Sequence, residues 1–294
     1  MATKKASKTT VKKKAIKATK KAAKDVVLGA AADRTKTVIQ RIKSLQQLPP
    51  EVYNTEEGLQ AVLKILGDAA EPLKLRFAAL DTLGAAAFSS SAFTACRADY
   101  IATLRKIATD QDPEMRRQVL GILTRQKDAY AQQQLLEGLQ DPAKALVPPE
   151  KALQLLGNDV HSDAYPVARS IAANPPNPAA RREALRLLAA DASYSPMFET
   201  LLSDKNETPE IRQLSAAALQ TTNPEELRKR GRDILMDSTD NEDVHQTVLA
   251  ALTHFGGDAL KEDSALVSRV SEMSGPAEKG VQKSARQFIE KYRR

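Results

Sequence analysis

Residues 56 to 290 alternate between segments with regularly spaced apolar residues and short polar turns. Apolar residues that recur at intervals of three and four positions predict amphipathic helices with one apolar face. One set of segments shares a pattern in which a position zero is followed by apolar residues four and seven positions later. Position zero falls at residues 76, 116, 149, 181, 212, 245 and 281. These regular intervals predict an internal repeat built from helix pairs.

Helix-start signals divide each repeat into two helices. Proline after a capping residue, as in Asp112-Pro113, Asn177-Pro178 and Thr208-Pro209, favours the first turn of a helix. These signals place the second helix of each pair. The first helices are predicted over residues 56–66, 93–108, 129–139, 163–173, 196–203, 224–236 and 263–273. An extra helix is predicted over residues 35–48, and residues 88–98 are interpreted as an irregular insertion.

A helix pair of this length exposes two apolar stripes and buries both only by stacking on neighbouring pairs. The predicted fold is therefore all-α, a right-handed α-solenoid of about seven helix pairs, forming one domain over residues 34–294. Composition supports helices, since aromatic residues make up 4% of the chain and Trp is absent. Residues 1–33 are predicted to form a disordered basic tail.

Two segments carry a family resemblance. Asp-Pro-Glu-Met-Arg-Arg-Gln-Val-Leu (112–120) and Pro-Leu-Lys-Leu-Arg-Phe-Ala-Ala-Leu-Asp-Thr-Leu-Gly (72–84) resemble HEAT repeats. The short period is similar to that of the HEAT-like repeats of phycobiliprotein lyases. The resemblance implies an armadillo-like helical array in which position-zero arginines pair with turn aspartates of an adjacent repeat. The arginines are Arg76, Arg116, Arg181 and Arg212, and the aspartates available are Asp68, Asp110, Asp141 and Asp204.

The helix face opposite the buried stripe is expected to line a groove. The residues of this face stand two and five positions after position zero. Position zero itself is predicted to lie in the middle of the buried stripe. Its charges are sparse and of both signs, so a protein or peptide partner is expected there rather than a nucleic-acid backbone. The candidate groove residues are Asp81, Gln118, Lys151, Gln154, Glu183, Arg186 and Thr247.

The net charge of +7 comes from the N-terminal tail, because acidic residues outnumber basic ones in the rest of the chain. A flexible lysine-rich strand is expected to bind DNA or RNA without sequence preference, through phosphate neutralisation. The segments KKAAK (20–24) and KKKAIKATKKA (12–22) resemble tails of linker histones and bacterial histone-like proteins. A solubilising tail and a cleaved targeting peptide are the alternatives. The tail lysines are Lys4, Lys5, Lys8, Lys12, Lys13, Lys14, Lys17, Lys20, Lys21 and Lys24.

Within the predicted solenoid, one basic cluster is dense enough to be a second candidate for nucleic acid, although a solvated helix face is the simpler interpretation. It consists of Arg228, Lys229, Arg230 and Arg232.

Other chemistry gives no catalytic or metal motif. Cys96 is the single cysteine and is predicted to be buried. His161, His245 and His254 lack zinc-ligand spacing, and no nucleotide-binding or nucleophile motif is present. The sequence therefore predicts a non-enzymatic scaffold or adaptor without cofactor or membrane span. We expect it in the cytoplasm, with nucleoid or chromatin association possible through the tail, and its oligomeric state is left open. The alternative is a HEAT-like enzyme, such as a bilin lyase or a DNA base glycosylase.

Overall fold

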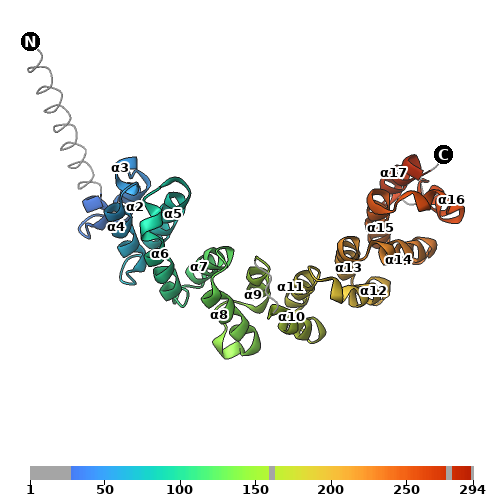
Figure 1. Ribbon diagram of the computed structural model, residues 1–294, viewed down its shortest axis with the longest axis horizontal. Coiled ribbons are helices and arrows are strands. Elements are labelled where there is room, and N and C mark those ends of the chain that lie inside the picture. The colour runs from blue at the N-terminus through green and yellow to red at the C-terminus, as the bar shows by residue number, and fades with distance from the viewer. Residues whose placement is uncertain (1–27, 159–162, 276–279, 293–294) are drawn as a thin grey trace, which may run out of the picture. The chain divides into compact units, whose positions relative to one another are not determined.

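The computed structural model describes residues 28–158, 163–275 and 280–292, and every regular element in these ranges is a helix (Figure 1). The helices form stacked pairs, which confirms the predicted all-α solenoid class. The first helices of the pairs are α4 (Glu56–Gly67), α6 (Phe93–Ile107), α8 (Ala129–Gln140), α10 (Ala164–Ala173), α12 (Ser195–Ser203), α14 (Pro224–Met236) and α16 (Ser264–Met273). The second helices are α5 (Leu73–Ser89), α7 (Pro113–Arg125), α9 (Pro149–Leu156), α11 (Pro178–Leu188), α13 (Pro209–Thr222), α15 (Glu242–Phe255) and α17 (Gln282–Tyr292).

Shorter elements complete the chain. The helices α2 (Val38–Gln46) and α3 (Pro50–Tyr53) precede the first pair. Three single turns of 3-10 helix lie between helices, namely η1 (Pro142–Lys144), η2 (Ala192–Tyr194) and η3 (Asp258–Lys261). Among the described residues, no helix combines the length and the apolar character that crossing a membrane requires.

The chain divides into two compact units, unit 1 over residues 1–133 and unit 2 over residues 134–294. In unit 1, α2 packs on α5, α4 packs on α5 and α6, and α6 packs on α7. In unit 2 the second helices stack in series from α9 to α17, and those from α11 onward each also pack on a first helix. The prediction of one domain over residues 34–294 stays a prediction about folding behaviour. Of the predicted disordered tail, residues 1–33, residues 1–27 lie outside the described residues. Residues 28–32 are helical, and Ala31 is buried.

Local sequence explains where the second helices begin. The side chains of Asp112, Asn177 and Thr208 accept hydrogen bonds from backbone N–H groups three residues later, at 2.8, 2.7 and 3.3 Å. Proline follows each cap and lacks the N–H that would be unpaired there. The capping signals recognised in the sequence therefore act as predicted.

The segment interpreted as an irregular insertion, residues 88–98, is largely helical. Helix α5 continues to Ser89, and α6 begins only four residues later at Phe93. The long first repeat interval is thus taken up by two long helices rather than by an irregular loop. Packing explains the difference, since Phe93, Cys96 and Tyr100 are buried and hold the N-terminal half of α6 in place.

Candidate functional site

Buried ion pairs connect neighbouring helix pairs, and Arg212 at position zero of α13 makes the most buried one. Its Nε donates to the carbonyl oxygen of Leu202 at 2.8 Å, and its Nη2 donates to Oδ2 of Asp240 at 2.7 Å. A second bond joins Nη1 to Oδ1 of the same carboxylate. The Arg212 and Asp240 side chains are only 2% and 3% exposed. A bidentate pair satisfies both charges in this dry setting.

The same arrangement recurs along the chain, and we call it a bracket. In each bracket an arginine joins a carbonyl oxygen near the end of the first helix of its own pair to an acidic side chain in the turn of the next pair. Arg76 donates to the Leu66 carbonyl at 3.1 Å and to Asp110 at 2.6 Å. Arg181 likewise joins the Ala172 carbonyl at 3.3 Å to Glu207. These brackets hold the second helices in register, because each fixes one helix pair against the next.

Two position-zero residues depart from this bracket. Arg116 donates from Nη1 to the carbonyls of Asp110 and Gln111, at 2.6 and 3.0 Å. His245 is 3% exposed, and its Nε2 lies 2.9 Å from the Ile234 carbonyl oxygen. This histidine therefore contacts a buried carbonyl oxygen equivalent to the one that an arginine contacts in other repeats.

The brackets shift the ionisation of their acids. Burial raises the pKa of the Asp240 carboxyl, but the hydrogen bonds from Arg212 and from the Asn241 backbone N–H outweigh it and leave the pKa below its ordinary value. Asp110 behaves in the same way, with burial opposed by Arg76. The bracket of Arg181 raises the pKa of its guanidinium through the hydrogen bonds to Glu207. These groups remain charged across the neutral range.

The pairing implied by the HEAT resemblance is right in kind, and Asp110 is the one acid of the four named that forms the bracket. Asp68 instead pairs with Arg34 at 2.7 Å, and Asp141 lies 3.8 Å from Lys144. Asp204 accepts from the Asn206 backbone N–H within its own turn. The bracketing acid lies one or two residues before the helix cap, where it faces the arginine of the preceding pair. Asp240 directly precedes the cap Asn241, and Asp110 lies two residues before the cap Asp112.

A furrow runs along the second helices of unit 2 and is the candidate functional site. Its first part is a pocket of about 490 Å³ between α11 and α13. This pocket is lined by Arg186, Ala189, Glu210, Gln213, Leu214, Ala217, Ala218 and Thr221. Its second part, of about 530 Å³, is formed by α13, α15 and α17. The second pocket is lined by Ala216, Ala217, Gln220, Gln246, Thr247, Ala250, Ala251, His254, Phe255 and Ser284.

Ala217 lines both pockets, so the two hollows meet on the surface of α13. The helices α13, α15 and α17 lie in sequence along this part of unit 2 (Figure 1). Gln213 bridges two of them, since its Nε2 donates to Oγ1 of Thr247 at 3.0 Å. We call the surface formed by the two lining sets the furrow.

Charged groups at the furrow are already paired. Oε1 of Glu210 accepts from Arg182 at 2.9 Å, and Oε1 of Glu183 accepts from Arg186 at 2.6 Å. Thr247 donates its hydroxyl to the Asp243 carbonyl. The furrow therefore presents alanines, neutral amides and hydroxyls with little net charge.

The structure separates the predicted groove residues into three groups. Arg186 and Thr247 line the furrow, and Glu183 contacts it through Arg186. The predicted residues Lys151 and Gln154 lie on α9, where the Lys151 Nζ donates to Gln154 at 2.7 Å. The remaining two, Asp81 and Gln118, lie in unit 1, where Gln118 donates to Glu114 at 2.8 Å. Binding at these residues stays a prediction.

Several furrow residues were missed by the sequence analysis, among them Gln213, Gln220, Gln246, His254 and Phe255. The expected groove was followed only two and five positions beyond position zero. At 100° per residue the same face continues nine positions on, where Thr221 and His254 stand. The glutamines occupy the flank of that face, one or eight positions beyond position zero. Extending the count by one helical turn would have found Thr221 and His254, whereas the glutamines and Phe255 lie beside that line of positions.

The helix end beside the furrow depends on two glycines. Helix α15 ends at Phe255, and Gly256 and Gly257 follow. Gly257 has φ +74°, a conformation that favours glycine, and a Cβ on Gly256 would lie 2.1 Å from Cδ1 of Leu260. This turn leaves the Phe255 side chain 51% exposed beside His254.

The basic cluster on α14 is largely neutralised. Arg232 donates to Asp263 at 2.6 Å, Arg230 lies near Glu199 and Glu226 at 3.8 and 3.5 Å, and Lys229 lies 3.6 Å from Glu226. Arg228 forms no ion pair within the described part of the chain. These contacts favour a solvated helix face, the simpler of the two interpretations. The ten tail lysines, 4 to 24, lie outside the described residues.

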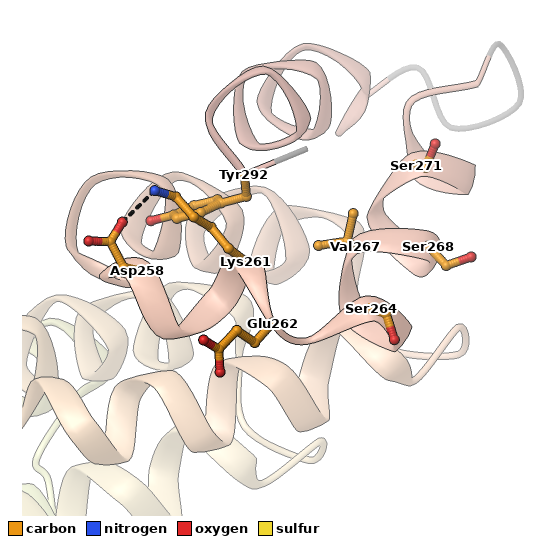
Figure 2. Close-up of a pocket in the computed structure, with 8 residues that line it drawn as sticks. All are labelled: Asp258, Lys261, Glu262, Ser264, Val267, Ser268, Ser271 and Tyr292. Atoms are coloured by element: carbon orange, nitrogen blue, oxygen red, sulfur yellow. Dashed lines mark ion pairs between the residues drawn. The ribbon is translucent and has the colours of Figure 1, made fainter. Parts of the chain in front are cut away.

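A further pocket of about 620 Å³ lies at the α16–α17 pair (Figure 2). It was not foreseen in the sequence, although Ser264, Ser268 and Ser271 recur on one face of α16 at helical spacing. Among its lining residues, Lys261 Nζ and Asp258 Oδ1 form an ion pair at 2.6 Å. The Tyr292 hydroxyl donates to the Leu252 carbonyl. The pocket is lined by Asp258, Lys261, Glu262, Ser264, Val267, Ser268, Ser271 and Tyr292. It involves a single helix pair, whereas the furrow spans four helices.

Cys96 is 2% exposed, as predicted, and burial raises the pKa of its thiol. Of the three histidines, His161 lies outside the described residues, His245 is buried and His254 is exposed. Among the described residues, no three His, Cys, Asp or Glu side chains gather as metal ligands would.

Comparison with known proteins gives a structural likeness alone. No family model matches the chain, and no curated protein sequence matches it. A solved structure of human deoxyhypusine hydroxylase in complex with glycerol is similar at 17% sequence identity, with a TM-score of 0.35. The match covers 81% of this chain and 96% of the hydroxylase chain.

This likeness corrects one prediction. The absence of catalytic motifs predicted that the chain is not an enzyme, and that prediction is contradicted, since the similar structure is named as a hydroxylase. At this level of similarity the hydroxylase activity does not transfer to this chain.

Proposed function

We propose that the protein is a binding module of HEAT-like helical repeats that holds a segment of a partner protein in the furrow of unit 2. The observation that carries the proposal is that two neighbouring hollows share Ala217 as a lining residue, on a face where the charges are already paired. Concave surfaces of stacked repeats are suited to extended contacts of this kind.

Packing keeps this surface open. The brackets of Arg181 and Arg212 fix α11, α13 and α15 against their neighbours, so the furrow is preformed rather than created on binding. A rigid, preformed surface lowers the ordering cost that binding must offset. The short side chains of Ala217 and Ala250, both exposed, leave room above the helices.

A selection of random peptides displayed on phage, using the purified full-length protein as target, tests the proposal. Peptides that bind the wild type should lose affinity for Ala217→Arg and for Ala250→Arg, because either side chain would fill the furrow. The matched control is Ala265→Arg, at an exposed alanine of α16 outside the furrow. All three substitutions suit an exposed helix position, since arginine is a good helix former.

If selection yields no specific peptide, or if the selected peptides bind Ala217→Arg and Ala250→Arg as tightly as Ala265→Arg, the furrow is not the binding surface. Circular dichroism of each variant checks that the helices are retained.

A second activity concerns the tail, and its support is the sequence alone. We propose that Lys4 to Lys24 bind DNA, RNA or another polyanion, which would bring a furrow-bound protein to nucleoid or chromatin. The ion pairs that neutralise the α14 cluster favour the tail over the body as the contact. Affinity for duplex DNA and heparin should fall steeply with salt and vanish in a variant lacking residues 1–24. Retained binding would transfer the contact to the body and make Arg228 the first residue to substitute.

An enzymatic function is the alternative proposal. A HEAT-like bilin lyase would attach a bilin covalently to an apo-phycobiliprotein, and a base glycosylase would release a free base from damaged DNA. Mass spectrometry of the acceptor protein detects the first activity, and chromatography of released bases detects the second.

A further inference from the structure

The furrow's side chains indicate which kind of segment it takes. We infer that the occupant is an extended, uncharged peptide segment of a partner protein, rich in small side chains and held mainly through its main chain. This inference rests on the proposed function, because it names the partner chemistry of the same surface.

Neutral amides provide the main argument. Gln220 and Gln246 line the second pocket and have no hydrogen-bond partner among the described residues. A glutamine amide offers both donors and an acceptor, so it can pair with a peptide N–H and a peptide C=O together. An extended peptide presents these groups unpaired, whereas a helix has already paired most of its own. The furrow's amides therefore match an extended main chain.

The floor of the furrow supports a close approach of that chain. Ala217 and Ala250 are exposed, and Ala216, Ala218 and Ala251 beside them are buried. A partner helix binds by placing large apolar side chains into an apolar groove. Here the two pockets are lined mostly by alanine, glutamine and threonine, with Leu214 and Phe255 as the large apolar residues. Small side chains on the occupant let its main chain reach the amides.

Charge selects against a basic or acidic occupant. Glu210 is paired with Arg182, and Arg186 is paired with Glu183. A charged peptide would lose hydration in the furrow without gaining a free counter-charge. The chain's own lysine-rich segment, residues 1–24, is therefore a poor occupant, and a neutral partner segment is favoured.

One end of the furrow provides an apolar anchor. Phe255 is 51% exposed, and its ring centroid lies 6.2 Å from that of His254. Exposed aromatic side chains are common anchors in interfaces because they bury a large area at low entropic cost. The occupant is thus expected to carry one apolar residue near the end that lies against Phe255.

The test uses the full-length protein and the peptides selected on it. Selected sequences should be enriched in Gly, Ala, Ser and Thr, depleted in charged residues, and should carry one apolar residue at a constant position. Methylation of alternate backbone nitrogens should weaken binding by about tenfold or more, since each removed donor costs one or more hydrogen bonds. Methylation at the intervening nitrogens should have less effect.

Variants locate the contacts. Gln220→Leu and Gln246→Leu should each weaken the selected peptides about fivefold, the effect of one lost hydrogen bond, and Phe255→Ala should weaken only peptides that carry the apolar anchor. Gln46→Leu, at an exposed glutamine of α2 in unit 1, is the matched control. A synthetic peptide of residues 1–27 should not compete with the selected peptides.

The outcomes distinguish a wrong occupant from a wrong binding surface. If selected peptides are lost in Ala217→Arg but are helical or charged, and are insensitive to Gln220→Leu and to backbone methylation, the inferred occupant is wrong and the proposed function stands. Competition by the 1–27 peptide would identify the chain's own tail as occupant and would also overturn the inference. Binding that survives Ala217→Arg overturns both.

Discussion

The two units use the same bracket and differ in the surface that it supports. In unit 1, Arg76 and Asp110 are 5% and 12% exposed, and α7 packs mainly on α6. In unit 2, Arg212 and Asp240 are 2% and 3% exposed, and α13, α15 and α17 pack side by side. The bracket alone therefore does not produce a furrow. Serial stacking of the second helices produces it, and this stacking is a property of unit 2.

Exposed apolar residues mark the same difference. Phe88 at the end of α5 is 99% exposed, and Ile39 on α2 is 79% exposed. In unit 2 the exposed Phe255 lies at a pocket that two further helices line. The exposed ring of Phe255 therefore lies beside residues of neighbouring helices, whereas the Phe88 ring has no such neighbours within the described part of unit 1.

The largest expected effect comes from breaking the bracket of unit 2. Arg212→Met should leave the Asp240 carboxylate buried without its partner and lower the stability of unit 2 by about 3–5 kcal/mol. Arg76→Met should cost unit 1 less, because Asp110 is more exposed. Hydrogen exchange measured by mass spectrometry on peptides from each unit, together with urea unfolding, reports both effects.

Arg186→Met provides the matched control for this comparison. Its side chain is 55% exposed, so the loss of its pair with Glu183 should cost at most about 1 kcal/mol. Equal protection in Arg212→Met and Arg186→Met would show that the buried bracket does not stabilise unit 2.

A smaller effect is expected from acid. The pKa values of Asp110 and Asp240 are lower in the folded protein than in the unfolded chain, where an aspartate has a pKa of about 4. Their contribution is therefore complete above about pH 4 and is lost as pH falls through the lower folded pKa. Asp240→Asn should flatten the acid limb of unfolding in unit 2 and leave that of unit 1 unchanged. An unchanged acid limb in unit 2 would contradict the assignment.

Alkaline pH should distinguish unit 1. Burial raises the pKa of Tyr100 to about 12, against about 10 in the unfolded chain. Its contribution is complete below about pH 10 and is lost as pH rises towards 12, amounting to about 1 kcal/mol at pH 11. Tyr100→Phe should remove that loss in unit 1, measured as the difference in urea midpoint between pH 8 and pH 11. Persistence of the full loss in Tyr100→Phe would assign it to other groups.

The smallest effect is expected at Phe88. Because its side chain is almost fully exposed, Phe88→Ser should change the stability of unit 1 by no more than about 0.5 kcal/mol. Phe93→Ala is the matched control, since Phe93 is 7% exposed and packs edge-on against Tyr100, and it should cost about 3–5 kcal/mol. A large loss in Phe88→Ser would reveal a packing contact for this ring.

Most helices could be predicted from the sequence, because helix formation depends on residues three and four positions apart. Helix α14 begins and ends as expected, at Pro224 and Met236, since Asn223 caps it and proline follows. The prediction of an irregular segment over residues 88–98 was wrong. The long repeat interval at this point suggested an irregular loop, although the residues of α5 and α6 favour helices.

The furrow could be predicted only in part. Arg186 and Thr247 were named because the helical period places them on the face opposite the buried stripe. Gln220 and Phe255 were not named, since their role depends on where neighbouring helices leave space.

The sequence by itself determined the helices, their caps, the charge asymmetry between tail and body, and a position zero that is buried at Arg76, Arg212, His245 and Val281. These features follow from local spacing and composition. The tertiary structure decided that Arg212 pairs with Asp240, and Arg76 with Asp110, across 28 and 34 residues. It also decided that two hollows meet at Ala217. Contacts between repeats depend on how whole helices pack, and that packing is set by many side chains together rather than by the spacing of a few.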